Sequence, residues 1–250
     1  MKTLQLFILA FLFVAIAPLS AQSADEIIAN YLENTGGAEN WEKLSGIEFT
    51  GKINVQGMQL PIIQVQTKSG KQMMKADVQG QTFYQEVYDG ETLWGTNQMT
   101  MAAEKSDAET TNNFKNNLND FPDPFLNYKD KNYTVELIGN ETIEGTETYK
   151  IKLVKEPIMV DGNEVEDVSY YYFDTENFVP IVVEEEITQG PGKGMMAQVK
   201  FSDYQEVDGL YFPFAIVQGV KDQPGMQITL TEIKLNPDID DTMFSYPEEK

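Results

Sequence analysis

Gly46-Ile-Glu-Phe-Thr-Gly-Lys-Ile-Asn-Val55 is the stretch that decides the fold, because apolar and polar side chains alternate along most of it. This period of two predicts a β-strand with one buried face. Pairs such as Asp89-Gly90 and Glu144-Gly145, which favour tight turns, separate most of the runs that follow. Further runs with strand character lie near residues 60–67, 72–78, 82–88, 92–104, 133–139, 147–155, 167–173, 179–188, 195–203, 211–219 and 226–235. The sequence therefore predicts a mainly β (α+β) fold, with about eleven antiparallel strands in a strongly curved sheet or barrel.

Two short helical segments precede the first strand. Ser23 and Glu26 have the spacing of a capping box, and an apolar stripe at helical spacing runs from Ile27 to Leu32. Gly36-Gly37 ends this helix, and Trp41 lies on a second, brief helical turn. The sequence therefore predicts two short helices before the first strand.

A longer interruption of the strand pattern lies between about residues 105 and 132. Ser106 and Glu109 again have capping-box spacing, and Phe114, Leu118 and Phe121 form one apolar stripe. Threonine and asparagine crowd this helix, so its stability depends on docking the stripe on an apolar surface. The segment is either a lid that opens over the sheet or a permanently packed cap.

The N-terminus predicts export. Residues 1–21 read as a signal peptide, because Lys2 precedes an apolar run from Leu4 to Ala17 that is too short to cross a bilayer. An uncleaved anchor is the alternative. Residues 22–250 then form a single domain, and the absence of cysteine excludes a lipid-modified N-terminus. A chain without disulfides in an oxidising space fits a bacterial periplasm, where we expect a soluble protein.

The charge of the chain limits its partners. The formal net charge is −22, and the sequence contains neither arginine nor histidine. Such an excess of negative charge repels phosphate backbones and anionic lipid headgroups. The sequence therefore predicts no nucleic-acid binding and no tight electrostatic adhesion to a membrane.

The available side chains also argue against catalysis. Without histidine and cysteine, the common nucleophile–base pairs and the usual transition-metal ligands cannot be built. The run Glu184-Glu185-Glu186 is interpreted as a solvated strand face, and the acidic groups at 161–164 and 238–241 as turns rather than calcium loops. We therefore predict a protein that is not an enzyme, with no catalytic residue, metal or cofactor.

Several short segments between residues 24 and 247 share an order typical of one family. They are Tyr31 to Gly37 with Trp41, Tyr88-Asp-Gly-Glu-Thr-Leu-Trp94, Tyr172-Phe-Asp-Thr175 with Val179-Pro-Ile181, Asp203-Tyr204 with Val207-Asp-Gly-Leu-Tyr-Phe-Pro213, and Asn236-Pro-Asp-Ile-Asp-Asp-Thr-Met-Phe244. Together they resemble the LolA/LolB-type outer-membrane lipoprotein carriers and sorting proteins. The segment that ends at Pro213 is frequent in periplasmic relatives from Bacteroidota.

The resemblance implies an unclosed antiparallel β-barrel with helices over its concave face. It also implies an apolar cavity for the acyl chains of lipoproteins or another lipid, and Lol-type proteins of the inner and outer membranes as partners of a monomeric carrier. The carriers use an inward-facing arginine that hydrogen-bonds the lid. This sequence has none, and no lysine stands in an obviously equivalent place, so that gating mechanism does not transfer.

Two sets of apolar residues are candidates for the binding site, although each could equally fill a core. The candidates for the cavity wall are Phe49, Ile53, Met74, Phe83, Val87, Trp94, Met99 and Met101. The candidates for the lid are Phe114, Leu118, Phe121 and Phe125. The alternative function is a non-catalytic interaction or structural module of the cell envelope, with a filled concave face and no lipid.

Leu118→Asp tests whether the stripe docks the lid. A charge buried at the centre of the stripe should undo the docking. We expect limited proteolysis to cut faster between residues 105 and 130 in this variant than in the unmodified protein. Unchanged cleavage would count against a docked lid.

Overall fold

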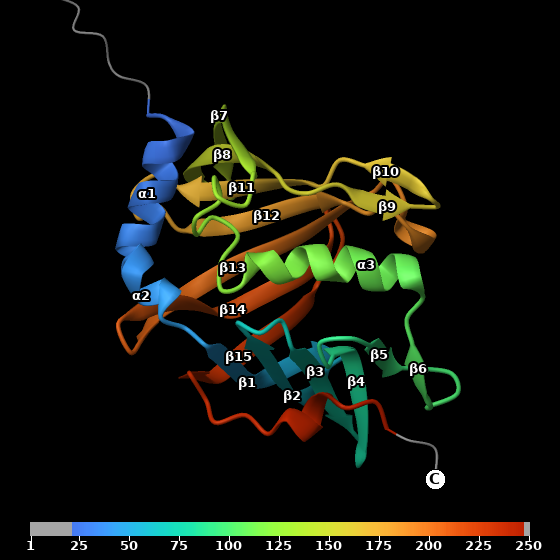
Figure 1. The fold of residues 1–250 in the computed structure, drawn as a ribbon. Coiled ribbons are helices and arrows are strands. Elements are labelled where there is room, and N and C mark those ends of the chain that lie inside the picture. Colours follow the sequence, from blue (N-terminus) through green and yellow to red (C-terminus); the bar gives the residue numbers. More distant parts are fainter. Residues whose placement is uncertain (1–21, 248–250) are drawn as a thin grey trace, which may run out of the picture.

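Thirteen strands form one antiparallel sheet in the computed structural model, which describes residues 22–247 (Figure 1). The predicted signal peptide lies outside the described residues. The sheet order is β6-β5-β4-β3-β2-β1-β15-β14-β13-β12-β11-β8-β7. The strands are β1 (Gly46–Val55), β2 (Met58–Thr67), β3 (Gln72–Val78), β4 (Gln81–Tyr88), β5 (Leu93–Thr96), β6 (Ala103–Lys105), β7 (Thr134–Ile143), β8 (Thr146–Val154), β11 (Val168–Asp174), β12 (Pro180–Glu186), β13 (Met196–Val207), β14 (Leu210–Val220) and β15 (Met226–Leu235).

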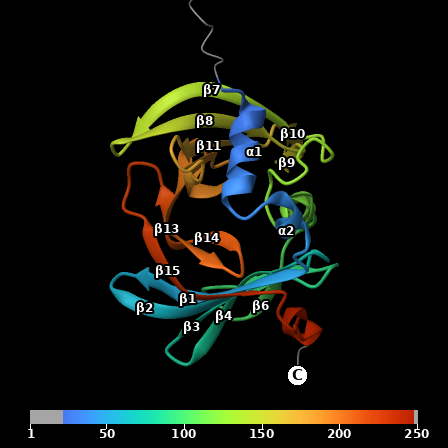
Figure 2. The ribbon, with the colours of Figure 1, turned by 90° about the vertical axis from the view of Figure 1, so that its left-hand side faces the viewer.

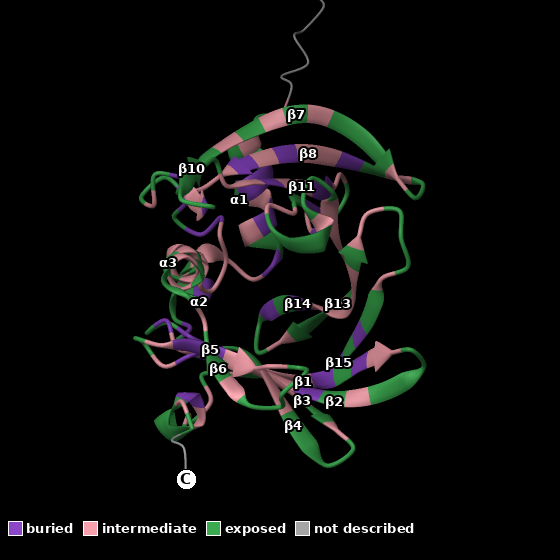
Figure 3. Cartoon of the chain, turned by 90° about the vertical axis from the view of Figure 1, so that its right-hand side faces the viewer, coloured by how far each residue is buried: buried purple, intermediate pink, exposed green. Residues whose placement is uncertain are grey.

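The sheet curls around a hollow without closing. Figures 2 and 3 show its two halves facing each other, and the edge strands β6 and β7 do not pair with one another. The helix α3 (Ala108–Asn117) lies between the halves and is seen end-on in Figure 3. This arrangement confirms the predicted fold class, an unclosed antiparallel barrel with helices on its concave side.

The strand pattern differs from the prediction in two places. The run at 92–104 is divided into β5 and β6, because the Asn97 side chain accepts hydrogen bonds from the backbone amides of Met99 and Thr100 and holds a loop between them. A second hairpin, β9 (Ile158–Val160) with β10 (Asn163–Val165), turns at Asp161-Gly162 outside the main sheet. Both strands of this hairpin are too short to show a period in the sequence.

The N-terminal helices fill one end of the concave side. The capping box at the start of α1 (Ala24–Asn34) forms as predicted, with the Ser23 hydroxyl accepting from the amide of Glu26 and the Glu26 carboxylate accepting from the amide of Ser23. Ile27 is fully buried in a cluster with β8 and β11. The helix α2 (Ala38–Glu42) brings Trp41 against Phe212, with 5.0 Å between ring centroids.

The chain that follows α3 and the 3₁₀ turn η1 (Leu118–Asp120) packs beside these helices. Phe125 is 1% exposed and lies against Tyr31 and Phe173. The Asp123 carboxylate accepts hydrogen bonds from the Tyr31 hydroxyl at 2.6 Å and from the amide of Phe125 at 2.8 Å. Burial raises the pKa of Asp123 above its usual value, despite these hydrogen bonds. The segment is thus fixed to α1 by apolar and polar contacts together.

The opposite face of β2 to β5 is covered by the C-terminal segment, on the side away from α3 (Figures 1 and 2). Phe244, at the end of the 3₁₀ turn η3 (Asp241–Phe244), is fully buried against Val65, Met73 and Val87. The Trp94 indole donates a hydrogen bond to the carbonyl of Phe244 at 3.0 Å. These strands therefore bury side chains on both faces. Within residues 22–247, none of the helices has the length and apolar character needed to span a bilayer.

Gly36→Ala should destabilise the protein more than Gly37→Ala. The backbone φ angles of the two glycines are 116° and 87°, so each substitution carries strain of about 1–3 kcal/mol. A Cβ atom on Gly36 would also lie 2.2 Å from the carbonyl oxygen of Gly209 in the β13–β14 turn, whereas one on Gly37 meets nothing within 4 Å. Urea unfolding should show the larger loss for Gly36→Ala, by about 2 kcal/mol or more. Equal losses would contradict close docking of the α1 C-terminus on that turn.

Candidate ligand-binding site

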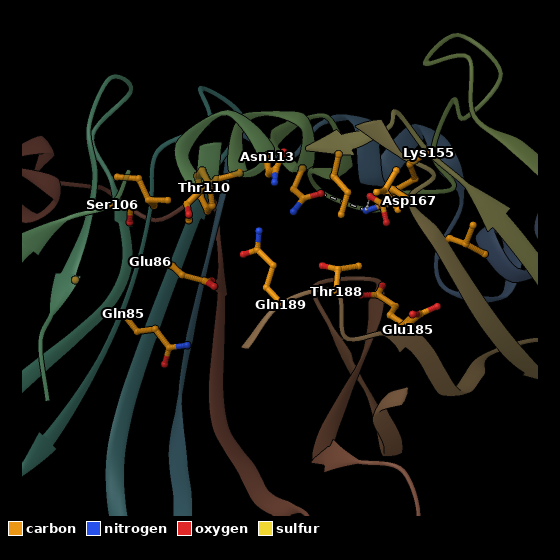
Figure 4. Close-up of a pocket in the computed structure, with 18 of the residues that line it drawn as sticks. Gln85, Glu86, Ser106, Thr110, Asn113, Lys155, Asp167, Glu185, Thr188 and Gln189 are labelled. Atoms are coloured by element: carbon orange, nitrogen blue, oxygen red, sulfur yellow. Dashed lines mark hydrogen bonds and ion pairs between the residues drawn. The ribbon is translucent and has the colours of Figure 1, made fainter. Parts of the chain in front are cut away.

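The hollow between the halves of the sheet contains two adjoining cavities beneath α3. Their volumes are about 870 Å³ and 410 Å³. Five residues line both cavities and so mark their junction: Glu86, Phe114, Asn117, Lys155 and Glu185. Figure 4 shows that Glu86 reaches into this space from one wall, while Glu185 and Lys155 lie on the other. The hollow is therefore large enough to take a ligand, and α3 is its roof.

The wall of the hollow combines apolar and polar side chains. The apolar part of the larger cavity includes Leu93, Phe114, Ile158, Val168, Tyr170 and Met196, and the smaller cavity adds Leu118, Phe121 and Tyr171. Tyr84 and Trp94 also border the larger cavity, but their rings pack on the opposite face of the sheet. The polar part of the larger cavity includes Gln85, Glu86, Thr110, Asn113, Lys152, Lys155, Glu166, Asp167, Glu185, Glu186, Thr188 and Gln189. The site can therefore hold a molecule with both an apolar and a polar portion, which differs from the wholly apolar cavity that we expected.

One side of the α3 roof is held by apolar contacts. The Phe114 ring packs on Tyr88 with 5.2 Å between centroids, and a Cβ atom on Gly70 would lie 3.0 Å from the Leu118 side chain. No residue of α3 is fully buried. Its N-cap is Asp107, whose carboxylate accepts a hydrogen bond from the amide of Thr110, and not Ser106 as the sequence suggested. The helix is therefore held by few apolar contacts.

The other side of α3 is tied to the β9–β10 hairpin by hydrogen bonds. The Asn113 amide donates to the carbonyl of Met159 at 2.7 Å and accepts from its backbone amide at 2.8 Å. The Glu109 carboxylate accepts from the amides of Asp161 and Gly162, which explains why Glu109 does not complete a capping box. The hairpin and the roof are thus one connected unit.

Lys155 joins the hollow to the chain that leaves α3. Its ammonium group lies 3.0 Å from the Asp120 carboxylate, 3.2 Å from the Asp167 carboxylate and 3.3 Å from the Asn117 side-chain oxygen. Burial alone would lower the pKa of Lys155, but the two carboxylates outweigh it and raise the pKa above its usual value. Lys155 therefore forms an inward-facing contact with the lid segment.

Glu86 lies at a bulge in β4, where the register against β3 shifts between Gln72 and Met74. Its φ angle of 50° is unusual for a residue with a side chain, and it accompanies the projection of the carboxylate into the hollow. Partial desolvation by the surrounding walls raises the pKa of Glu86 above its usual value, although the residue remains exposed to solvent in the hollow. No ion pair or hydrogen bond to this carboxylate is found within residues 22–247.

The predicted wall residues fall into four different environments. Trp94 borders the larger cavity, but its indole packs with Val87 in the cluster beneath the C-terminal segment, on the face away from α3. Phe49, Ile53 and Met74 belong to the core cluster under α2. Val87 packs against the C-terminal segment, Phe83 is half-buried on β4, and Met99 and Met101 are in the exposed loop between β5 and β6, where Met99 is 90% exposed.

Three of the four predicted lid residues lie in the roof of the hollow, and the fourth lies in the core. Phe114, Leu118 and Phe121 line the cavities and belong to the roof. Phe125 is instead a core residue, because it is enclosed by rings from α1 and β11. The chain that follows the apolar stripe is therefore fixed in the core at Phe125, and we call the segment around this residue the anchor.

The acidic run on β12 agrees with its interpretation as a solvated face at Glu185 and Glu186, which are exposed, but not at Glu184. Glu184 is 4% exposed, where it pairs with Lys221 at 2.8 Å and accepts hydrogen bonds from Tyr172 and Gln198. Glu185 and Glu186 line the larger cavity. The alternation of apolar and polar side chains stops before this run, so the sequence pattern did not indicate which carboxylates face inward.

Comparison with known proteins supports the fold. No protein-family model matches the sequence, and no curated protein shows significant sequence similarity to it. Solved structures are similar: a LolA superfamily protein from Nitrosomonas europaea matches with a TM-score of 0.51 at 13% identity, covering 90% of this chain and 98% of that one.

Two further structures agree with this match. A domain assigned to an outer membrane lipoprotein-sorting protein of Vibrio parahaemolyticus gives a TM-score of 0.51 at 10% identity, covering 88% of this chain and 94% of the other. A DUF1329 family protein from Desulfovibrio piger gives 0.52 at 11% identity, covering 88% and 97%. The chain has a LolA-like fold, as its short segments suggested.

Asn113→Ala should loosen the roof without unfolding the domain. The change removes two hydrogen bonds to Met159, each worth about 0.5–1.5 kcal/mol. We expect faster amide hydrogen exchange in residues 106–121 and 157–165, with little change in β1 or β15. Asn112→Ala, at an exposed position on the same helix that lines neither cavity, is the control. Equal exchange in both variants would show that the amide pair does not hold the roof.

Proposed function

We propose that this protein is a periplasmic carrier that holds the acyl chain of a lipoprotein, or of another lipid, in the hollow beneath α3. The observation that carries the proposal is the hollow itself: a curved sheet leaves about 870 Å³ unfilled next to an aromatic and aliphatic wall. Ligand pockets in proteins commonly have about 300–1,000 Å³ and close around most of the ligand. The larger cavity is within this range.

The energetics of an acyl chain make such a hollow useful. Each buried methylene is worth about 0.8 kcal/mol, so a chain of about sixteen carbons gains roughly 12 kcal/mol by leaving water. A soluble protein can move the chain between membranes only if its own interior offers a comparable gain. The apolar side chains beneath α3 would supply part of it, and release would depend on a partner in the receiving membrane.

The roof has the features of a part that moves. It has no fully buried residue, and hydrogen bonds from half-exposed asparagines tie it to a small hairpin. Segments with few buried apolar contacts open at lower free energy than the rest of a domain. The adjoining anchor around Phe125 is fully buried and would stay in place. Ligand would therefore enter by displacement of α3 together with β9 and β10.

The setting of this activity follows from the sequence and the fold. The predicted signal peptide would deliver the protein to the periplasm, where a monomer could meet Lol-type proteins of the inner and outer membranes. The LolA-like fold, shared with the lipoprotein-sorting domain from Vibrio parahaemolyticus, supports this role and a binding function rather than an enzymatic one. The acidic surface would keep such a carrier from adhering to anionic membranes.

Thr110→Trp tests the site directly. Thr110 lines the larger cavity from α3, so an indole there should occupy the space of a bound chain. We expect the affinity for a neutral, fluorescent acyl probe to fall at least tenfold, and acyl species in organic extracts of the purified protein to decrease in mass spectrometry.

Asn112→Trp is the matched control, because this position is exposed and lines neither cavity. It should leave both readouts unchanged. Clean extracts and no probe binding by the unmodified protein would instead support the interaction module. Equal binding by both tryptophan variants would place the probe outside the hollow.

A further inference from the structure

Exposed apolar side chains gather at one end of the barrel. Among residues 22–247, eight large apolar side chains are exposed, and six of them lie in or beside connections at the same end of the strands. The six are Met58, Met99, Met101, Val165, Met195 and Met226, and we call them the rim. The other two, Ile138 and Tyr211, lie in the edge strand β7 and at the opposite end of β14. Single exposed apolar side chains are common, but a concentration of them at one end marks an interaction surface.

Strand pairing brings the rim together. Neighbouring strands of the sheet are antiparallel, so every second connection lies at the same end. Met58 pairs with Val55 on β1, and Gln227 pairs with Asn54, so one strand separates Met58 from Met226. The β5–β6 loop, the β9–β10 hairpin and the connection from β12 to β13 lie at the same end, and the first two are on the right-hand side of Figure 1. Figure 3 looks onto this end.

The larger cavity reaches the rim. Its lining includes Thr96 at the end of β5, Val165 on β10 and Gln189 in the connection from β12 to β13. Val165 thus belongs both to this lining and to the rim. The opposite end of the hollow is filled by α1, α2 and the anchor. The rim therefore surrounds the end at which the hollow is left open.

The β5–β6 loop holds its first methionine outward through hydrogen bonds. The Asn97 side-chain oxygen accepts from the amides of Met99 at 2.8 Å and Thr100 at 3.1 Å. The Asn97 amide donates to the carbonyl of Ala102, and the amide of Met101 donates to the carbonyl of Asn97, both at 2.8 Å. Met99 is 90% exposed on this loop. A loop tied in this way presents an apolar side chain as a fixed feature of the surface.

Uncharged segments carry or flank the rim on the half of the sheet that contains β1. Residues 53–67, 78–85 and 92–103 contain no aspartate, glutamate or lysine, although the net charge of the chain is −22. On the other half, Asp161 pairs with Lys193 at 3.1 Å, and Glu164 adds a negative charge. An anionic surface would therefore be repelled, whereas an uncharged surface could approach the rim closely.

We infer that the rim docks this protein on a lipid bilayer whose headgroups carry no net charge. The methionine side chains insert between the headgroups, and the open end of the hollow then faces the membrane. Attachment is reversible, because it depends on a small apolar area without help from charge. The inference adds an interaction surface to the proposed function and does not depend on which ligand the hollow takes.

The arrangement of the rim suits a bilayer better than a partner protein. A stable protein interface buries about 800 Å² on each partner around a continuous, closely packed centre. The rim side chains instead stand on separate hairpins and loops around an opening, so each can insert into a fluid surface by itself. Methionine is unbranched and flexible, and it adapts to irregular apolar surroundings such as acyl chains.

Vesicle flotation tests this inference. The purified protein is mixed at neutral pH with vesicles of phosphatidylcholine, or of phosphatidylcholine with phosphatidylglycerol. We expect it to float with the phosphatidylcholine vesicles, and the bound fraction to fall at least threefold with the anionic lipid, because apolar burial attracts and charge opposes. Salt at about 0.5 M should leave binding to phosphatidylcholine unchanged, since no ionic attraction is screened.

A pair of variants locates the binding at the rim. Met99→Ser/Met226→Ser should reduce the fraction bound to phosphatidylcholine vesicles at least threefold, because it removes two apolar side chains from the contact. Ile138→Ser/Tyr211→Ser is the matched control, since these side chains are exposed outside the rim. The control should float like the unmodified protein. Urea unfolding of both variants checks that the domain remains folded.

The outcomes separate the rim from the carrier function. Absence of flotation, stronger flotation with anionic vesicles or equal flotation of the two variants would each overturn the inference and leave the hollow as a ligand site. Thr110→Trp should weaken the neutral acyl probe but not flotation, and the rim variant should do the reverse. Loss of flotation in Thr110→Trp would assign vesicle binding to the hollow and overturn the rim. A dimer in analytical ultracentrifugation that the rim variant dissociates would assign the rim to a second copy of the chain and also overturn the inference.

Discussion

The pairing of β1 with β15 is the constraint on which the rest of the structure depends. It joins a meander of the first six strands to a second meander that ends at the C-terminal strand. The register shifts between Thr50 and Gly51, and a Cβ atom on Gly51 would lie 2.5 Å from the carbonyl oxygen of Thr229. Close approach at this bulge bends the pair of strands, as bulges do. The two halves of the sheet can then face each other across a hollow.

One end of that hollow is filled by side chains of the protein, whereas the other end is open. At one end, α1, α2 and the chain around Phe125 fill the concave side with two apolar clusters. At the other end only α3 crosses the space, and its asparagines and threonines are too polar and too short to fill it. The fully packed end supplies stability, which allows the other end to remain open without unfolding the domain.

The sequence predicts the elements well because their signals are local. Strand periods, turn pairs and the Ser23 capping box each involve residues close in the chain. The site is harder to predict, because alternation along a strand indicates a face but not what covers it. Phe49 and Ile53 have the same pattern as a cavity wall, yet α2 packs over their cluster. Val87 belongs to the opposite face, which the distant C-terminal segment buries.

Charged residues were the least predictable part of the site. Lys155 reaches Asp120 because the lid segment folds back over the end of β8, and it reaches Asp167 because the start of β11 lies beside that end. No spacing in the sequence reveals the contact with Asp120. Glu86 enters the hollow through a bulge, which breaks the alternation that a sequence reading relies on. The chain has forty acidic residues, so the sequence alone does not distinguish the few that line the hollow from the many on the outer surface.

The two attachments of α3 differ in the way they can be released. Hydrogen bonds to the β9–β10 hairpin exchange readily with water, since their net worth is about 0.5–1.5 kcal/mol each. The contacts of Phe114 and Leu118 are apolar, so a ligand with an aliphatic chain could replace them with equivalent contacts of its own. The ion pairs of Lys155 would be lost without replacement if the chain beyond Asn117 moved. Opening should therefore separate α3 from the β4 wall first, with the Lys155 cluster as the pivot and the hairpin moving along.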